Sequence, residues 1–423
     1  MANETSPGSV APRLIGIERE WFSRAADMLA VAAAVVLPWS TSALAIVVVL
    51  WVLAFIPNAN RDVLSRVLLS AAGGLPVLLW ILGVAGMAWA DVSWTERLNG
   101  LNSFHKLLLI PLFLAHFQQS ERGQAVMVGF LASCVVYLGA SWLSYLVPGF
   151  PHAAGKHLGI PAKDHIARTA LFTISIAILI AQAVECWKAS QKMRAAAYAL
   201  LVAAFLLNIF IVATSRMAFV VLPIIFLLFG LKFLDWRGAV GLLIALAMLA
   251  AVGWQFSPYM RARVTTFFTE VENYRSDGAR TPSAERLEFW KKSVGFVAAA
   301  PIIGHGTGSI SDQFRRSTKD QTGVAALAAD NPHNQTLAVA IQLGAVGVAV
   351  LMAMWLAHFL LFRGGGMAAW VGFAVVVQNF VGSLFNTHIF DFTHGWGYVI
   401  GVGVAGGMVL KGARDAETKV LTI

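Results

Sequence analysis

His333 is the residue of this sequence that is best suited to acid–base chemistry. It lies in the tetrapeptide Asn-Pro-His-Asn at 331–334, which predicts a helix start with Asn331 as the N-cap, Pro332 at the first helical position and His333 at the second. A neutral imidazole accepts a proton near neutral pH, and the positive end of a helix dipole favours the neutral form. We therefore predict that His333 is a general base, beside a helix start that also attracts an anion. The alternative is a histidine that only hydrogen-bonds a loop.

Three arginines are candidates for binding phosphate, because the planar guanidinium offers a rigid pair of donors that matches phosphate oxygens. Arg216 lies in a short turn between two apolar segments, Arg286 borders an amphipathic helix, and Arg168 lies near the end of another apolar segment. For Arg216 the alternative is a side chain that extends along the membrane surface. For Arg286 the alternative is an ion pair with Glu285 or with lipid phosphate. For Arg168 the alternative is a residue that only marks the end of a membrane span and has no role in binding.

Several sequence patterns that would indicate other chemistry are missing. There is no Gly-x-x-x-x-Gly-Lys-Ser/Thr phosphate loop, so an ATP-driven pump is not expected. No two aspartates are separated by a single residue, so the Asp-x-Asp metal site of many nucleotide-sugar glycosyltransferases is not expected either. No histidines and cysteines have the spacing of zinc ligands. The sequence therefore predicts neither a metal site nor a cofactor.

The elements that would position these residues are predicted to be membrane-spanning helices. Of the 423 residues, 58% are hydrophobic and 13% are charged, and the mean hydropathy is +0.71. Soluble domains contain about 25% charged residues, so a soluble fold of this chain would expose too much apolar surface. Apolar stretches of about 20 residues cross a bilayer as helices. The predicted fold is an all-α polytopic membrane protein of about twelve spans, near residues 25–40, 41–57, 67–90, 100–117, 123–147, 166–187, 194–214, 217–234, 238–256, 333–361, 367–385 and 395–411.

The distribution of lysine and arginine predicts the orientation of these spans. Short segments on one side contain 15 of the 31 cations and short segments on the other side contain 6, while the remaining 10 lie in the long segment 257–332. Cytoplasmic loops carry the excess of positive residues, so both termini are predicted to be cytoplasmic and segment 257–332 to be extracytoplasmic. Nucleic acid is not available on that side, whereas phosphate-bearing lipid is.

The chain divides into three predicted parts: a bundle of about nine spans at 1–256, the extracytoplasmic loop at 257–332, and three further spans with a cytoplasmic tail at 333–423. The loop contains a predicted helix that begins with Thr281 as the N-cap and ends before Pro301. Its predicted apolar stripe consists of Leu287, Trp290, Val294 and Ala298, and its predicted polar side of Glu285, Glu288 and Lys292. We expect this helix to lie on the membrane surface or to cap the bundle.

An ordered set of short motifs runs through the second half of the chain. It consists of Arg286-x-x-x-Trp290, then Pro301-Ile302-Ile303-Gly304-His305-Gly306, then Pro332-His333-Asn334-Gln335-Thr336-Leu337 leading to Gly344 and Gly347. Together with the twelve-span layout, this set resembles the O-antigen ligase and polymerase superfamily of bacterial inner membranes. The short turn at Ser215 and Arg216 is also similar to a position of that family.

The resemblance implies a GT-C-like glycosyltransferase of the inner membrane with its active site on the periplasmic face. It would transfer an O-antigen glycan from undecaprenyl diphosphate to a sugar hydroxyl of lipid A-core, without a metal and with inversion at the anomeric carbon. Carried over by position, His333 would be the base and Arg216 and Arg286 would bind the diphosphate, which makes these three the predicted catalytic residues. Further substrate contacts are predicted for Arg168, Asn334, Gly304, Gly306 and Asp391.

Other functions stay open at this point. Within the same superfamily the alternatives are an O-antigen polymerase and a protein O-oligosaccharyltransferase. The short predicted cytoplasmic tail disfavours the second, because protein-glycosylating members usually have a larger extracytoplasmic C-terminal part. No arginine is followed by glycine after ten intervening residues, a pattern found in some polymerases. A lipid or solute transporter is a further alternative, but the predicted spans contain almost none of the acidic residues that ion-coupled transport usually needs.

Overall fold

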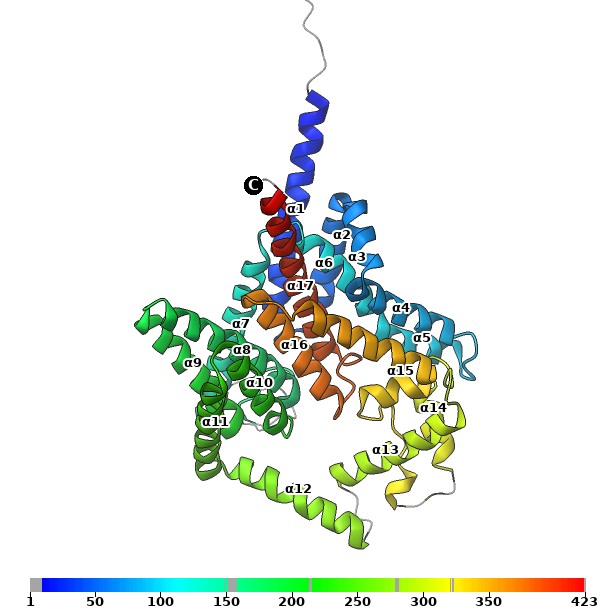
Figure 1. Cartoon of the computed structure of the whole chain (residues 1–423). Coiled ribbons are helices and arrows are strands. Elements are labelled where there is room, and N and C mark those ends of the chain that lie inside the picture. Colours follow the sequence, from blue (N-terminus) through cyan, green and yellow to red (C-terminus); the bar gives the residue numbers. More distant parts are fainter. Residues whose placement is uncertain are drawn as a thin grey trace, which may run out of the picture.

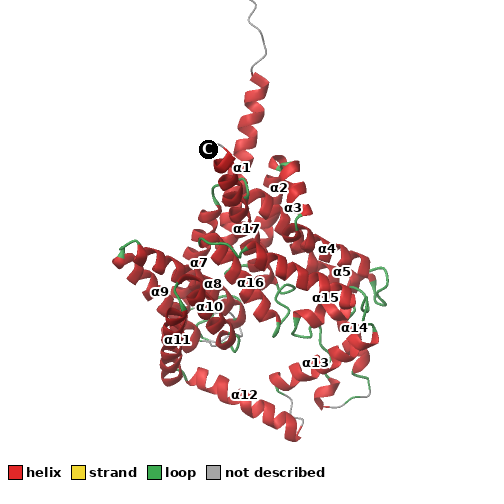
Figure 2. Cartoon of the chain, viewed as in Figure 1, coloured by secondary structure: helices red, strands yellow, loops and turns green. Residues whose placement is uncertain are grey.

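The computed structural model describes residues 10–147, 149–150, 158–212, 215–277, 281–319, 321 and 323–421, and every regular element within them is a helix (Figure 2). This confirms the predicted all-α class. The helices are α1 (Val10–Val36), α2 (Thr41–Phe55), η1 (Ile56–Asn58), α3 (Arg61–Leu69), α4 (Ala71–Gly86), α5 (Trp94–His105), η2 (Lys106–Leu108), α6 (Leu109–Phe117), α7 (Gly123–Leu146), α8 (His165–Lys188), α9 (Lys192–Ile211), α10 (Ala218–Phe233), α11 (Trp236–Phe256), α12 (Pro258–Asp277), α13 (Pro282–Ala299), α14 (Ile310–Ser317), η3 (Gly323–Ala326), α15 (Gln335–Leu361), α16 (Met367–Ser383) and α17 (Phe392–Leu421).

Eight helices in the described part of the chain are long and apolar enough to cross a membrane, and a ninth span results if α3 and α4, which are bent by 76°, count as one. α10 and α16 are shorter apolar helices. Each of the twelve predicted spans coincides with a helix, but the count of twelve remains a prediction. The multi-pass membrane character of the chain is therefore supported by both its composition and its helices.

The helices of segment 257–332 lie together at one end of the molecule. In Figure 1, α12, α13 and α14 lie at the bottom, whereas the start of α1 and the end of α17 lie at the top. α13 contacts both α12 and α15, and α14 contacts α13 and α15. The long segment between α11 and α15 is thus a helical layer that covers the end of the bundle opposite the two ends of the described chain.

α15 is interrupted at Gly344, whose φ of 61° and ψ of −158° are not helical. A bilayer offers no water to the backbone groups that such a break sets free, so they need partners within the protein. The segment after α13 supplies them: Ala345 N donates to Pro301 O (2.8 Å), Val346 N to Ile302 O (3.2 Å), His305 N to Ile341 O (2.8 Å) and Gly306 N to Gln342 O (2.9 Å). Two of the motifs that were recognised separately in the sequence therefore form one structural unit.

We predict that Gly344→Ala destabilises the protein strongly. An added Cβ would lie 2.3 Å from both the carbonyl carbon and the oxygen of Ile302, in a backbone conformation that L-residues rarely adopt. Backbone strain of this kind costs about 1–3 kcal/mol before the steric overlap is counted. The thermal unfolding temperature in detergent should fall clearly below that of wild type. Gly364→Ala is the matched control, because a Cβ there meets open space, and equal unfolding temperatures for the two variants would contradict the prediction.

α13 begins and ends where the sequence predicted. The Thr281 hydroxyl accepts a hydrogen bond from Ala284 N (3.2 Å), Pro282 occupies the first helical position, and the helix ends at Ala299, two residues before Pro301. The predicted apolar stripe does not face the rest of the protein, since Leu287 and Val294 are 40% and 61% exposed, whereas Glu288 on the predicted polar side is buried.

The reason for the different face is a contact that the sequence pattern does not contain. Phe289, which lies outside the predicted stripe, packs edge-to-face on Phe314 of α14 with ring centroids 5.5 Å apart. α14 is fixed in turn to the start of α5 by an ion pair of 2.6 Å between Arg315 and Glu96. The side of α13 that faces the protein is therefore set by α14 and not by the most apolar stripe.

Candidate active site

His333 lies just before α15 and not inside its first turn. The N-cap of α15 is Asn334, whose side chain accepts a hydrogen bond from Leu337 N at 3.0 Å. Asn331 instead accepts from His333 N at 2.7 Å, which forms a side-chain turn that ends at His333 with a φ of 53°. The prediction that Asn331 is the N-cap and that His333 is the second helical residue is therefore wrong. The start of α15 is nonetheless only two residues away from His333.

The imidazole of His333 is held by a side chain from the loop after α16. Its Nδ1 lies 3.1 Å from Oδ1 of Asn386. An amide oxygen only accepts hydrogen bonds, so Nδ1 is the protonated nitrogen and Nε2 of the neutral ring carries the lone pair. The ring also stacks on Phe289 of α13, with centroids 6.2 Å apart and an interplanar angle of 23°. His333 is therefore oriented with Nε2 as the atom that can accept a proton.

The surroundings of His333 favour the neutral form. Burial lowers the pKa of His333 below its ordinary value, the hydrogen bond to Asn386 raises it in part, and the charge of Arg286 lowers it again. The net shift is downward, so the imidazole is unprotonated near neutral pH. The predicted general base is thus in the protonation state that a base needs.

We predict that Asn386→Asp moves the pH dependence of the reaction. A base is active when neutral, so the wild-type rate should fall only as the pH drops through the pKa of His333, which is lowered by burial. A carboxylate at position 386 would favour the imidazolium and raise that pKa, so the acidic limb of the pH–rate profile should move to higher pH. Asn386→Ala is the control, since it removes the orienting partner without adding charge. An unchanged acidic limb in Asn386→Asp would contradict the proposed link between Asn386 and His333.

Arg286 and Arg216 both lie at the first turns of α13: Arg286 is part of this helix, and Arg216 contacts it from the turn before α10. The charge of Arg286 acts on His333, and Arg286 lies one turn before Phe289, which stacks on that histidine. Arg216 lies in the turn before α10, where its Nη1 donates to the hydroxyl of Ser283 (2.7 Å) in the first turn of α13. The structure therefore places Arg286 beside His333 and Arg216 at the start of the helix that carries Arg286.

Arg216 also forms an ion pair with a glutamate of α12. Its Nη2 lies 3.0 Å from Oε2 of Glu270, which accepts a further hydrogen bond from Ser283. Burial alone would raise the pKa of Glu270, but the hydrogen bonds from Ser283 and Arg216 outweigh it and the pKa is lowered. An incoming phosphate at Arg216 would have to compete with this carboxylate.

Arg168 lies away from this group, in the interior formed by α7, α8 and α9. It is 0% exposed, and its Nη1 donates to Asn208 Oδ1 (2.8 Å) and Ser141 Oγ (3.0 Å). Such a fully buried guanidinium needs these partners to offset its lost hydration. These hydrogen bonds show that Arg168 joins α7, α8 and α9. Substrate binding by Arg168 remains a prediction.

The remaining predicted substrate contacts fall into two groups. Gly304 and Gly306 pack against backbone, since an added Cβ would lie 2.5 Å from Gln342 at the first position and 2.5 Å from Ala90 at the second. Asn334 caps α15 with its oxygen and donates from its amide nitrogen to Leu384 O (3.1 Å). The positions of these three residues are thus explained by packing and capping, and only the fourth residue, Asp391, lines the cavity described next.

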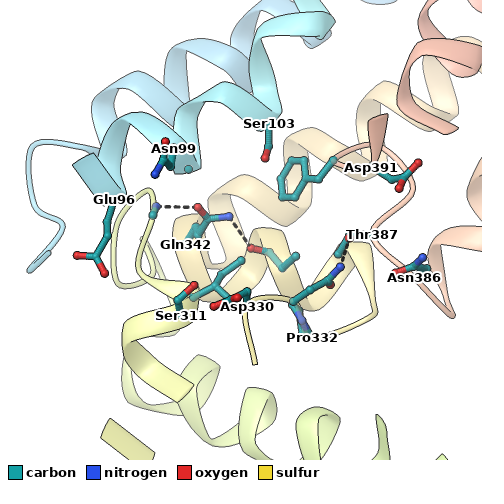
Figure 3. A pocket seen from close by; sticks show the side chains of 16 residues that line it. Glu96, Asn99, Ser103, Ser311, Asp330, Pro332, Gln342, Asn386, Thr387 and Asp391 are labelled. Carbon is teal, nitrogen blue, oxygen red and sulfur yellow. Dashed lines mark hydrogen bonds between the residues drawn. The ribbon is translucent and has the colours of Figure 1, made fainter. Parts of the chain in front are cut away.

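A polar cavity of about 350 Å³ borders the turn that precedes His333, with Asn331 and Pro332 in its wall (Figure 3). It is lined by Glu96, Asn99, Gly100, Ser103, Gly308, Ile310, Ser311, Asp330, Asn331, Pro332, Ala338, Gln342, Asn386, Thr387, Phe390 and Asp391. Most of these residues could not be predicted from the sequence, because they come from four distant segments and share no spacing. Asp391 is the one predicted substrate contact among them.

Asp391 is held by a histidine at the start of α17. Its Oδ1 accepts from Nδ1 of His394 (2.6 Å) and from the backbone N of the same residue (3.0 Å). Burial alone would raise the pKa of Asp391, but these hydrogen bonds and the nearby His394 lower it well below the usual range. Lys106 donates to the backbone oxygens of Phe390 and Asp391 at 3.0 and 2.8 Å. The loop that carries Asn386 and Asp391 is therefore fixed at several points.

The arrangement can support one kind of chemistry directly. A neutral imidazole with a free Nε2 can take a proton from a hydroxyl group, while Arg286 beside it can stabilise an anion that forms or departs. Among the residues that the structure describes, no three histidine, cysteine or acidic side chains are arranged to hold a metal ion.

Comparison with known proteins gives one match. Residues 201–352 match the family model described as O-antigen ligase, which confirms the resemblance recognised in the sequence. The matched part contains Arg216, Arg286 and His333, and it excludes Arg168 and Asp391. No curated protein matches the chain.

Proposed function

Because residues 201–352 match the O-antigen ligase family, as expected for a member of the O-antigen ligase and polymerase superfamily, we propose that this chain is an O-antigen ligase. It transfers the glycan from undecaprenyl diphosphate to a sugar hydroxyl of lipid A-core. Members of the family are glycosyltransferase-like membrane enzymes, and the all-helical, apolar chain fits that class. The observation that carries the proposal is the oriented, neutral His333 beside Arg286.

The proposed reaction is a single displacement at the anomeric carbon of the donor. Nε2 of His333 takes the proton of the acceptor hydroxyl as its oxygen bonds to the anomeric carbon, and the bond from that carbon to the diphosphate oxygen breaks. The departing undecaprenyl diphosphate gains negative charge, and the guanidinium groups of Arg286 and Arg216 stabilise this charge. Attack opposite the leaving group inverts the anomeric configuration. Holding both substrates in line supplies a further part of the rate.

Both substrates are anchored in lipid, so the reaction belongs at a membrane surface. α12, α13 and α14 lie opposite the start of α1 and the end of α17 (Figure 1), and α13 contacts His333 through Phe289. With both termini in the cytoplasm, as the distribution of cations predicts, the layer formed by these three helices faces the periplasm of a bacterial cell. We therefore place the protein in the inner membrane with its active site at the periplasmic face.

The proposal is tested by reconstitution of the full chain in liposomes that contain undecaprenyl diphosphate-linked glycan and lipid A-core. The ligase should produce lipid A-core that carries the glycan. Elongation of the glycan on undecaprenyl diphosphate would instead identify a polymerase, and glycan on an added protein acceptor would identify a protein O-oligosaccharyltransferase. Either result without glycan on lipid A-core would contradict the ligase assignment.

We also predict that transfer does not depend on a divalent metal. The guanidinium groups of Arg286 and Arg216 are proposed to stabilise the diphosphate, so the rate in excess chelator should equal the rate without it. The measurement is the initial rate of transfer in proteoliposomes before and after chelator treatment. A rate that is lost with chelator and restored by an added divalent ion would contradict this part of the mechanism.

A further inference from the structure

The polar cavity beside His333 is not used by the mechanism described so far. Its volume of about 350 Å³ lies at the lower end of the range of about 300–1,000 Å³ that is typical of small-molecule sites. α5, the start of α14, the coil before α15 and the loop before α17 each contribute to its wall. A cavity of this size accommodates a small part of a glycan rather than a long chain.

The side chains of the cavity suit a ligand with many hydroxyl groups. Neutral amides and hydroxyls predominate, three carboxylates accompany them, and none of the lining residues is lysine or arginine. A sugar hydroxyl both donates and accepts, so it can bond an amide, a serine and a carboxylate alike. A diphosphate would meet only negative charge here, which disfavours it. The lining therefore favours an uncharged sugar over a phosphate group.

Several of these side chains are available to a ligand. Within the described part of the chain, the side chains of Asn99, Ser103, Ser311 and Asp330 form no hydrogen bond or ion pair. In Figure 3, Asn99 and Ser103 lie on one side of Gln342, and Ser311 and Asp330 on the other. Gln342 itself is fixed, because it accepts from Gly308 N (2.8 Å) and donates to Ala338 O (3.0 Å).

The cavity shares a wall with the proposed base. Pro332 precedes His333 in the chain, and Asn386 holds Nδ1 of its ring, and both residues line the cavity. Asn331, which forms the turn at His333, is fixed to the opposite loop by a hydrogen bond of 2.7 Å from its amide to Thr387. α13, which carries Arg286, contributes no residue to the lining. The wall of the cavity is therefore formed without Arg286 or any other residue of α13.

We propose that this cavity binds the sugar of lipid A-core that carries the acceptor hydroxyl. In a displacement with inversion, the attacking oxygen and the leaving group lie on opposite sides of the anomeric carbon. The leaving diphosphate belongs with Arg286, so the attacking sugar belongs at a surface near His333 to which Arg286 does not contribute, as in this cavity. This inference rests on the proposed function and adds to it the location and the chemistry of the acceptor site.

The test uses steady-state kinetics of the full chain in proteoliposomes with the acceptor concentration varied. Asp330→Ala and Asn99→Ala should each raise KM for lipid A-core by about tenfold, as the loss of a hydrogen bond to a hydroxyl ligand predicts. KM for the donor and kcat at saturating acceptor should stay at wild-type values. Glu185→Ala, at an exposed carboxylate near the far end of α8, is the matched control and should change neither constant.

A second measurement separates this inference from the proposed function. Binding of deacylated lipid A-core oligosaccharide to the detergent-solubilised chain is followed by saturation-transfer NMR, with the Asp330→Ala, Asn99→Ala double variant beside wild type. Binding that is lost in the double variant supports a sugar site whether or not transfer to lipid A-core is observed. Wild-type transfer with unchanged acceptor KM in both variants overturns the acceptor site and leaves the ligase standing. Absence of oligosaccharide binding to the wild-type chain also overturns it.

Discussion

Replacing His333 with alanine is expected to lower the rate of glycan transfer by about 10²–10⁴-fold, the usual contribution of a positioned general base. The acceptor hydroxyl would then lose its proton to water or not at all during attack. The effect should appear in kcat, because His333 has no assigned part in holding either lipid. His333→Gln should be as inactive as His333→Ala, since an amide does not act as a base near neutral pH. The measurement is the initial rate of transfer to lipid A-core in proteoliposomes.

The matched control for this result is His105→Ala. His105 is an exposed histidine at the end of α5 whose Nδ1 contacts only Leu101 O in its own helix (3.0 Å). It should retain the wild-type rate. The unfolding temperatures of both variants should also stay close to wild type, because His333 is only half-buried in a coil. Full activity of His333→Ala would remove His333 as the base and would return it to the alternative of a histidine that orders a loop.

Arg286→Ala is expected to lower the rate of transfer by about 10²–10³-fold, the cost of removing one group that stabilises developing charge. Burial of the site strengthens such an electrostatic contribution, because water no longer screens the charge. Arg286→Lys should recover part of the rate, since it keeps the charge but loses the paired donors that match a diphosphate. The measurement is the rate at saturating donor together with KM for the donor.

Lys291→Ala on the same helix is the control for Arg286, since it removes an exposed cation from the opposite side of α13. It should leave the rate unchanged. Arg216→Ala gives a less direct test, because Arg216 also holds Ser283 and Glu270 and its loss would disturb the contact between α12 and α13. A wild-type rate for Arg286→Ala would show that the diphosphate is stabilised elsewhere in the site.

The class of fold and the helices could be predicted because they depend on local properties of the chain. An apolar run of sufficient length forms a helix in a membrane whatever its neighbours are. The start of α13 is equally local, since Thr281 and the following proline define it within a few residues. For the same reason, His333, Arg216 and Arg286 could be named from short motifs.

The details of the site depend on contacts between distant segments and could not be predicted. Two asparagines flank the turn at His333, and which of them caps α15 is decided by the bond from Asn331 to Thr387, 56 residues away in the sequence. The exposed face of α13 is set by Phe314 of another helix. The role of the glycine motifs depends on hydrogen bonds between distant segments, because the backbone oxygens of Pro301 and Ile302 accept from the residues that follow Gly344.

The cavity illustrates the same limit most clearly. Asn99, Ser311 and Asp330 do not stand out in the sequence, and α14 is joined to the α5 region by contacts between distant segments, such as the ion pairs Arg315–Glu96 and Arg316–Asp91. Acidic and neutral side chains gathered in this way have no common motif. A sequence can therefore name the proposed base and the proposed cations of this site, whereas the proposed binding surface for the second substrate emerges only from the fold.

The central claim is that His333 and Arg286 act together on a lipid-linked diphosphate, and a structure of the full chain bound to undecaprenyl diphosphate-linked glycan tests it most directly. We predict that the diphosphate lies within hydrogen-bond distance of Arg286, with Arg216 behind it. Nε2 of His333 should face the anomeric carbon from the side of the polar cavity. A diphosphate bound away from Arg286, or an anomeric carbon on the side of His333 that Nε2 does not face, would contradict the account.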